Sequence, residues 1–298
     1  MAKNQSRALA FGIGTVLLWS TVATAFKLSL REWTPLQLLM VACAMSVVVI
    51  GGVLLVQGRL RMLFRLSPRD YALSVGLGLI NPALYYVTLF SAFDRLPAQE
   101  AQPLNYTWAL TLAYLAVPFL GQRLSRWDIL AGLVCYAGVV VIATRGEVLS
   151  LTFSDPVGVG LALLSTLVWA AYWIISTRDR REPVVGLFLN FLFGLPVITV
   201  LCLWQDGFPA ADGVALGAAL YVGAFEMGLA FVFWLMAMKL ATNTSQISNL
   251  IFISPFLSLV FIHFILGETI YHSTYTGLVL IVTGLWLQQW GRRRVRAS

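Results

Sequence analysis

The sequence predicts an all-α integral membrane protein, in which ten transmembrane helices form two inverted-topology repeats of five helices each. Three observations predict this fold class. The composition is too apolar for a water-facing surface, ten apolar runs have the length of a membrane span, and the two halves of the chain match at a nearly constant offset.

The composition excludes a soluble protein. Hydrophobic residues make up 59% of the 298 residues and charged residues 11%, against about 45–50% and about 25% in soluble domains. Cys43, Cys135 and Cys202 lie in apolar runs without CxxC spacing, and only two histidines are present. We therefore expect no disulfide framework, no metal site and no cofactor.

The apolar runs follow one another with short joints. A membrane-crossing helix needs about 20 mostly apolar residues, and lipid offers no hydrogen-bond partner to a non-helical backbone. The joints carry turn and charged residues, such as Ser67-Pro68-Arg69, and leave no room for a soluble domain. The ten predicted spans are residues 8–27, 35–57, 71–92, 98–120, 127–144, 157–177, 184–204, 213–238, 244–266 and 273–290.

The basic residues predict the orientation of these spans. If the N-terminus is cytoplasmic, the outer segments hold only Lys27, Arg31, Arg95 and Arg145, and the inner segments hold the other sixteen of the 20 Lys and Arg residues. A bias of this size is a strong positive-inside signal. Both termini are therefore predicted to be cytoplasmic. The terminal run Arg292-Arg293-Arg294 fits contact with anionic headgroups better than a nucleic-acid patch, so we expect no nucleic-acid partner.

The two halves of the chain match at an offset of roughly 145–150 residues. Leu17-Leu18-Trp19-Ser20 matches Leu167-Val168-Trp169-Ala170, Leu120-Gly121-Gln122 matches Leu266-Gly267-Glu268, and Gly138 matches Gly284. Because each half holds an odd number of spans, the two repeats run through the membrane in opposite directions. The predicted organisation is residues 1–145 as the first repeat, 146–156 as a linker and 157–298 as the second repeat.

These features resemble the drug/metabolite transporter superfamily, of the EamA type, over essentially the whole chain. Within it, Asn81-Pro82-Ala83-Leu84-Tyr85-Tyr86 and Leu104-Asn105-Tyr106-Thr107-Trp108 resemble the bacterial aromatic amino acid exporter group of the YddG type. The chain departs from that group at Ala109, where the group usually has Pro, and Gln122 stands where the superfamily more often has Glu. The resemblance implies a non-enzymatic transporter of amino acids in the bacterial inner membrane.

Polar and aromatic residues at depth are the candidate substrate-binding residues. Rings from several predicted spans fall at similar depth and adjoin buried amides, which predicts an aromatic-lined central cavity, although each ring alone could simply fill a gap between helices. The candidate residues are Trp19, Asn81, Tyr85, Tyr86, Asn105, Tyr106, Trp108 and Trp169.

Prolines and acids inside the spans are the remaining candidates. Pro82, Pro103, Pro196 and Pro255 each remove a backbone donor in mid-helix, so we expect a kink at each, and Pro82 and Pro255 are hinge candidates. We expect Glu100 to reach water at the outer mouth of the fourth predicted span, residues 98–120. Glu226 lies at the middle of the eighth, residues 213–238, without a basic partner, which favours its protonated form. Its role is either a structural hydrogen bond or proton coupling.

The predicted function is export of amino acids across the bacterial inner membrane by alternating access, with aromatic and other apolar amino acids as substrates. The absence of Lys and Arg at depth disfavours phosphorylated substrates. Export of drugs or other small neutral metabolites is the alternative within transport. An intramembrane enzyme lacks paired intramembrane Asp and any HExxH or GxSxG motif, and a channel lacks a filter-like repeat. The expected partners are a small-molecule substrate and membrane lipid, and the sequence is compatible with a monomer without deciding the oligomeric state.

Overall fold

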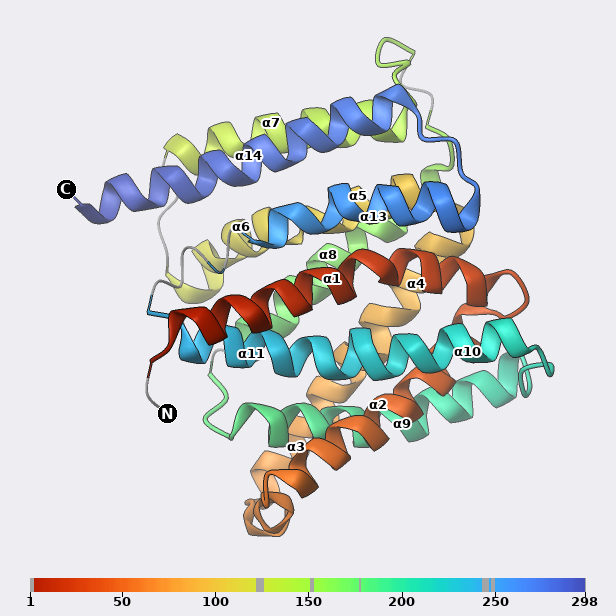
Figure 1. Ribbon diagram of the computed structural model, residues 1–298, viewed down its shortest axis with the longest axis vertical. Coiled ribbons are helices and arrows are strands. Elements are labelled where there is room, and N and C mark those ends of the chain that lie inside the picture. Colours follow the sequence, from red (N-terminus) through yellow and green to blue (C-terminus); the bar gives the residue numbers. More distant parts are fainter. Residues whose placement is uncertain are drawn as a thin grey trace. The chain divides into compact units, whose positions relative to one another are not determined.

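The computed structural model is helical, with no strand in the part of the chain that it describes (Figure 1). The structure describes residues 3–121, 126–150, 153–176, 178–242, 247 and 250–297, without the side chains of residues 239 and 292–297. The motif residue Gln122 therefore lies outside the described residues. Within them, seven helical segments are long and apolar enough to cross a membrane: Gln5–Leu30, Pro35–Val56, Pro68–Arg95, Arg126–Ala143, Pro156–Ser176, Pro183–Gln205 and Gly213–Met238.

Each of these seven segments matches a predicted span to within a few residues, and the other three predicted spans are also largely helical. The fourth is divided at Thr107 into α5 (Ala98–Tyr106) and α6 (Trp108–Leu120). The ninth is only partly described, as η4 (Ile251–Ile253), α13 (Ser254–Phe261) and η5 (Ile262–Leu266). The tenth is α14 (His272–Ala297), whose hydropathy is lowered by Gln288 and Gln289.

The chain divides into two compact units that interleave along the sequence. Unit 1 comprises Met1–Phe90 and Arg180–Leu266, and unit 2 comprises Ser91–Asp179 and Gly267–Ser298. Each unit therefore draws helices from both halves of the chain.

Unit 1 is built from the N-terminal helices and those of residues 180–266, which include η4, α13 and η5. Its long helices are α1 (Gln5–Leu30), α2 (Pro35–Val56) and α9 (Pro183–Gln205). Two further spans are composite: α3 (Pro68–Gly78), η2 (Leu79–Leu84) and α4 (Tyr85–Arg95, which leaves the unit after Phe90) form one, and α10 (Gly213–Tyr221), η3 (Val222–Leu229) and α11 (Ala230–Leu240) form the other. A short 3₁₀ helix, η1 (Leu60–Arg65), joins α2 to α3.

Helices α2 and α9 run antiparallel and bond to each other at both ends. The N-cap of α2, Thr34, accepts from Gln37 N and donates to Asp206 Oδ2 at the C-terminus of α9, at 2.6 Å. The N-cap of α9, Glu182, accepts from Val185 N and pairs with Arg59 just beyond the C-terminus of α2, at 2.7 Å. Each of these side chains thus caps the N-terminus of its own helix and also bonds to a residue at the C-terminal end of the other helix.

Unit 2 contains α5, α6, α7 (Arg126–Ala143), α8 (Pro156–Ser176) and α14. Helices α7 and α14 lie side by side and antiparallel (Figure 1). They approach so closely that a Cβ on Gly138 would lie 2.5 Å from Gly277 O, and one on Gly284 would lie 2.7 Å from Ala131 O. Between these contacts the Cys135 thiol donates to Ile281 O at 3.2 Å.

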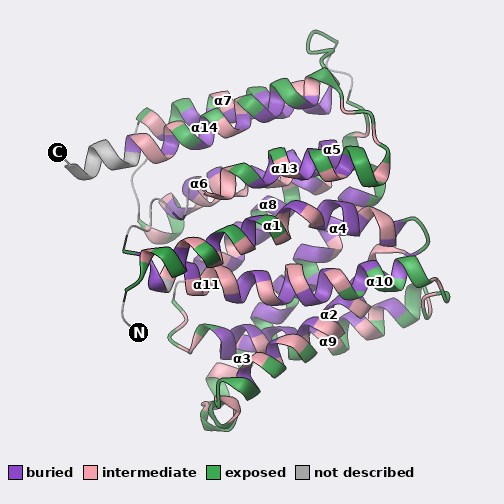
Figure 2. Ribbon diagram, viewed as in Figure 1, coloured by how far each residue is buried: buried purple, intermediate pink, exposed green. Residues whose placement is uncertain are grey.

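The outward faces of the span helices are apolar. Figure 2 shows exposed residues interleaved with buried ones along α7 and α14. Val48, Leu133 and Val200 are 68%, 68% and 67% exposed, on α2, α7 and α9. Exposing so many large apolar side chains to water would be unfavourable, so these faces fit contact with lipid.

The predicted kinks at the prolines have different outcomes. The chain leaves helical geometry at Asn81, directly before Pro82, which confirms that break. Helix α5 includes Pro103, and the division of that span comes later, at Thr107. Helix α9 continues through Pro196, and Pro255 lies in the first turn of α13, where its missing N–H has no intrahelical partner to lose.

Candidate functional site

The break in the third span contains a buried side-chain amide, that of Asn81. Asn81 has φ −142° and ψ 113°, so its backbone is extended between α3 and α4. Its side chain is fully buried, and neither the Oδ1 nor the Nδ2 atom has a hydrogen-bond partner among the described residues. Such a group is costly to leave unpaired, which marks Asn81 as a residue with unused hydrogen-bonding capacity.

Tyr85 and Tyr86 begin the helix that follows this break. Their ring centroids are 4.7 Å apart in an edge-to-face arrangement, and the Tyr86 ring lies 5.3 Å from that of Phe90. Both side chains are buried, Tyr86 completely. The Tyr86 hydroxyl donates to Glu226 Oε1 at 3.5 Å. The structure thus joins two predicted site residues from opposite halves of the chain.

Glu226 lies in η3, a π-helical segment in the middle of its span. Single π-helical turns widen a helix and occur frequently at functional sites. The Oε2 atom of Glu226 is buried without a hydrogen-bond partner in the described part of the chain. No Lys or Arg of the described residues forms an ion pair with it. The carboxyl group of Glu226 therefore has a hydrogen-bond partner, Tyr86, at one oxygen and none at the other among the described residues.

Trp19 and Pro255 lie elsewhere in unit 1. The Trp19 ring packs against Trp234 and Phe231 of α11, with ring centroids 5.6 Å and 6.4 Å away. One residue on, the Ser20 hydroxyl donates to Ser254 Oγ at 3.2 Å, so α1 is bonded to the start of α13 beside Pro255.

In unit 2, three candidate residues surround the division between α5 and α6. Tyr106 ends α5 and is buried, whereas Trp108 begins α6 and is partly exposed. Asn105 donates from Nδ2 to Ser165 Oγ on α8 at 3.0 Å. One helical turn further along α6, the hydroxyls of Thr111 and Thr166 are 3.0 Å apart. Helix α8 is thus bonded to both parts of the fourth span.

The last candidate, Trp169, lies on the same helix α8 and belongs to an aromatic cluster. Its ring is stacked on Tyr172 at 5.7 Å with an interplanar angle of 23°, and it meets Trp173 edge-to-face at 5.8 Å. Sequence reasoning missed Tyr172 and Trp173, although the spacing of three and four residues from Trp169 could have found them.

The expectation for Glu100 is wrong. Its side chain is fully buried, with Arg145 Nε donating to Oε1 at 2.8 Å and Ser154 Oγ donating to Oε2 at 2.6 Å. The hydrogen bond to Glu100 raises the pKa of the Arg145 guanidinium. Sequence reasoning missed this pair because the partners lie in different spans and loops.

Apart from Trp19, the predicted substrate-binding residues and Glu226 therefore fall into two groups. In unit 1, Tyr86 contacts both Tyr85 and Glu226, and Asn81 precedes Tyr85 on the same span. In unit 2, the residues Asn105, Tyr106, Trp108 and Trp169 lie on neighbouring helices. Within each group the side chains supply rings, amides and hydroxyls. A single cavity lined by both groups stays a prediction.

The sequence pattern of the EamA-like transporter family matches the chain twice, over residues 6–144 and 156–288. The chain belongs to this family. It is therefore a membrane transporter, and the resemblance to EamA-type transporters is confirmed.

Several relatives cover most of the chain. It is 23% identical to the aromatic amino acid exporter YddG of Salmonella typhimurium, over 98% of this chain and 99% of that protein. It is 25% identical to an uncharacterized transporter of Clostridium kluyveri, over 91% and 89%. It is 26% identical to a probable terminal-alkyne amino-acid exporter of Streptantibioticus cattleyicolor, over 76% of each. A solved crystal structure with a TM-score of 0.66 and 23% identity, covering 98% of this chain and 99% of the other, shows the same fold.

Proposed function

We propose that this EamA-family transporter exports amino acids, aromatic and other apolar ones among them, across the bacterial inner membrane by alternating access. The observation that carries the proposal is the match over nearly the full length to relatives named aromatic amino acid exporters. The two groups of candidate residues fit such substrates, because aromatic rings can stack on an apolar or aromatic side chain and amides can bond the ammonium and carboxylate groups.

An architecture of inverted repeats is part of the proposal, and the contacts within each unit support it. Cys135 on α7 bonds to Ile281, 146 residues later on α14, and Cys43 on α2 bonds to Phe191 O on α9, 148 residues later, at 3.7 Å. These separations equal the offset at which the two halves match. Residues that contact their own counterparts are what a pseudo-two-fold axis between antiparallel repeats requires.

We propose that both termini are cytoplasmic. The strong bias of basic residues supports this orientation, and ion pairs strengthen it. Of the four basic residues in the outer segments, Arg95 is paired with Asp155 at 3.2 Å and Arg145 with Glu100 at 2.8 Å. Two of the four outer charges are thus neutralised locally.

Glu226 has either a structural or a coupling role in this transporter. A protonated Glu226 could donate to a neighbouring helix from Oε2, and it could release its proton when the site opens to water, which would couple transport to pH. Its contact with Tyr86, on the same helix as Tyr85, supports a position beside the substrate path.

The test is counterflow in liposomes reconstituted with the purified protein, using labelled aromatic, aliphatic and charged amino acids, sugars and nucleosides. Uptake of aromatic and apolar amino acids above empty liposomes is the expected result. Counterflow of neutral drugs or nucleosides with no amino acid transported would contradict the proposal and favour the alternative substrate class.

A further inference from the structure

A groove opens at one end of unit 1, between the start of α1 and the end of α11. Its volume is about 720 Å³. Ala10, Phe11, Phe233 and Met236 form an apolar wall, in which the rings of Phe11 and Phe233 meet edge-to-face at 5.4 Å. Because both helices are candidate membrane spans and both end here, the groove lies where headgroups meet acyl chains.

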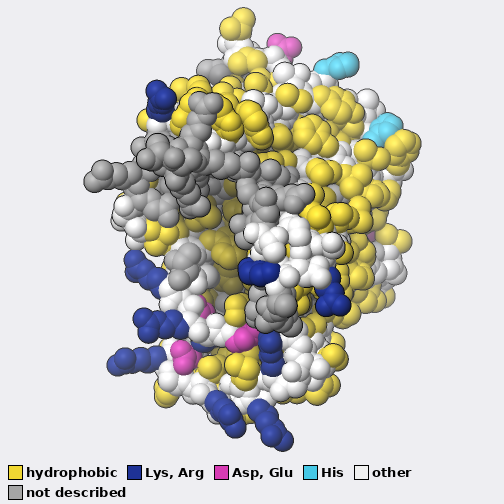
Figure 3. All heavy atoms as spheres, turned by 60° about the vertical axis from the view of Figure 1, so that its left-hand side comes forward, with side chains coloured by type: hydrophobic (Ala, Val, Ile, Leu, Met, Phe, Trp, Pro, Cys, Tyr) yellow, Lys and Arg dark blue, Asp and Glu magenta, His cyan; other side chains and the backbone are white. Residues whose placement is uncertain are grey.

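Two basic side chains, Lys3 and Arg7, stand at the mouth of this groove. Both are exposed, and no carboxylate of the described residues forms an ion pair with either. They lie at the N-terminus of α1, whose helix dipole adds partial positive charge. Figure 3 brings this end of unit 1 forward and shows Lys and Arg side chains gathered on it.

A neighbouring groove provides a comparison within the same unit. It has a volume of about 640 Å³, shares Met236 and also contains an arginine, Arg59. That arginine is already paired with Glu182 at 2.7 Å. The first groove therefore differs from the second in having uncompensated positive charge above its apolar wall.

We propose that the groove between α1 and α11 binds an anionic phospholipid. The phosphate lies between Lys3 and Arg7, and one acyl chain follows the wall formed by Phe11, Phe233 and Met236. Charge complementarity selects an anionic headgroup over a zwitterionic one, because the cationic group of a zwitterionic headgroup offsets the attraction of its phosphate to basic residues. This site is separate from the proposed substrate path and does not depend on which solute is transported.

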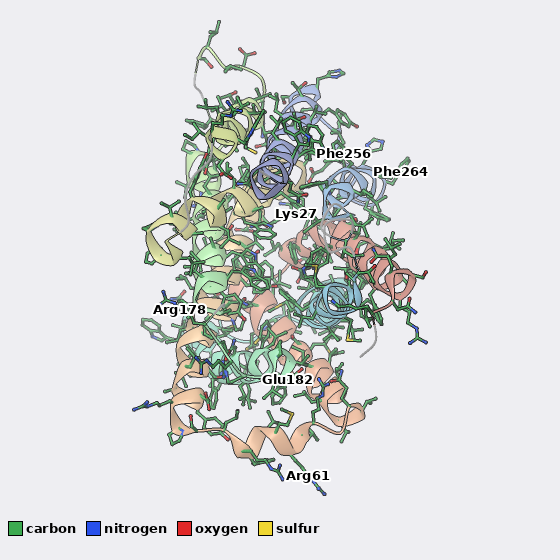
Figure 4. The ribbon with its side chains drawn as sticks, turned by 90° about the vertical axis from the view of Figure 1, so that its left-hand side faces the viewer. Lys27, Arg61, Arg178, Glu182, Phe256 and Phe264 are labelled. Atoms are coloured by element: carbon green, nitrogen blue, oxygen red, sulfur yellow. The ribbon has the colours of Figure 1, made fainter. Side chains whose placement is uncertain are left out.

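Native mass spectrometry of the purified full chain tests the proposal. Delipidated protein is titrated with phosphatidylglycerol or phosphatidylcholine, and the fraction carrying one lipid is measured for each. We expect Lys3→Gln/Arg7→Gln to weaken phosphatidylglycerol binding roughly 5- to 30-fold and to leave phosphatidylcholine binding nearly unchanged. Arg61→Gln/Arg65→Gln is the charge-matched control, since Arg61 lies on η1 outside the groove and points away from the protein (Figure 4).

A second variant separates seating in the groove from attraction to the surface. Ala10→Trp fills the groove without changing charge, and Ala10 is exposed, so the fold should tolerate it. Weaker phosphatidylglycerol binding in Ala10→Trp supports the proposal, and so does a lack of thermal stabilisation by inorganic phosphate alone. Equal phosphatidylglycerol binding in wild type, Lys3→Gln/Arg7→Gln and Ala10→Trp would overturn it, as would an equal loss in the Arg61→Gln/Arg65→Gln control.

Discussion

At the scale of single residues, the polar side chains between the helices fall into two kinds. Glu100 has partners for both oxygens, and Asn105 bonds to Ser165 across a helix interface. The amide of Asn81 and Oε2 of Glu226 have no partner among the described residues. Satisfied groups hold helices together, whereas unsatisfied ones can bond a substrate or a proton, so we expect function to concentrate at Asn81 and Glu226.

The stacking rings give the first prediction. Trp169→Ala and Trp108→Ala should each reduce counterflow of aromatic amino acids roughly 5- to 150-fold, because a stacking ring contributes about 1–3 kcal/mol to binding. Trp204→Ala is the matched control, since Trp204 is 79% exposed on α9. Melting temperatures in detergent should accompany the rates. If several of the candidate rings can be removed with normal counterflow, they serve packing and the substrate binds elsewhere.

The second prediction concerns Glu226. Glu226→Gln keeps the shape and can still accept the hydrogen bond from Tyr86, so the variant should fold and retain counterflow at a fixed pH. The informative measurement is the pH profile of net transport. Loss of pH dependence with intact counterflow identifies Glu226 as the coupling site, whereas an unchanged profile eliminates coupling and leaves the structural role.

The third prediction compares two ion pairs of unit 2. Arg145→Gln leaves the fully buried carboxylate of Glu100 without its charge partner, so it should lower the free energy of unfolding by about 1–3 kcal/mol. Arg95→Gln breaks a more exposed pair with Asp155 and should cost less than about 1 kcal/mol. Adding Glu100→Gln to Arg145→Gln should recover most of the loss. Equal losses for Arg145→Gln and Arg95→Gln in chemical unfolding would contradict this reasoning.

At the scale of elements, helix approach depends on small residues at the crossings. Gly277 on α14 faces the backbone of α7, and a Cβ there would lie 2.6 Å from Gly138 O. Gly277→Leu should therefore force the two helices apart and lower the unfolding free energy by about 3 kcal/mol or more. Gly160→Leu on α8 is the control, since nothing lies within 4 Å of a Cβ at that position. Thermal unfolding of both variants in the same detergent checks the difference.

The positions of most helices could be predicted from the sequence, because a backbone that crosses lipid must satisfy its own hydrogen bonds and therefore forms a helix. Apolar run length located the helices, and the Asn81-Pro82 pair located the break in the third span. Helix α9 continues through Pro196, so a proline inside a span need not end the helix, and the kink expected there stays a prediction. The division at Thr107 likewise has no proline or glycine at the break.

At the scale of the whole molecule, orientation is the property to test. The three native cysteines are buried, so background labelling should be low. Arg61→Cys on η1 should react with a membrane-impermeant maleimide only after cells are permeabilised. Leu149→Cys, at a position that is fully exposed in the loop after α7, should react in intact cells. Labelling of Arg61→Cys from outside intact cells would reverse the proposed topology.

The sequence identified most of the candidate site residues but few of their partners. Composition and depth pointed to Tyr86 and Glu226, and their contact follows from the fold, because they are 140 residues apart. The error at Glu100 has the same origin. Its charge partner Arg145 lies 45 residues away in the sequence, and no local sequence pattern predicts a pair at that separation.

The two ends of the α2–α9 pair carry unlike chemistry. At one end a neutral hydroxyl, that of Thr34, donates to Asp206, whereas at the other end a full cation and a full anion meet, Arg59 and Glu182. Dissolved salt weakens the attraction between the partly exposed charges of Arg59 and Glu182 more than it weakens a hydrogen bond donated by a neutral hydroxyl. Under the proposed topology these two ends face opposite sides of the membrane, so a rise in ionic strength on one side alone should loosen the Arg59–Glu182 end of the pair more than the same rise on the other side loosens the Thr34–Asp206 end.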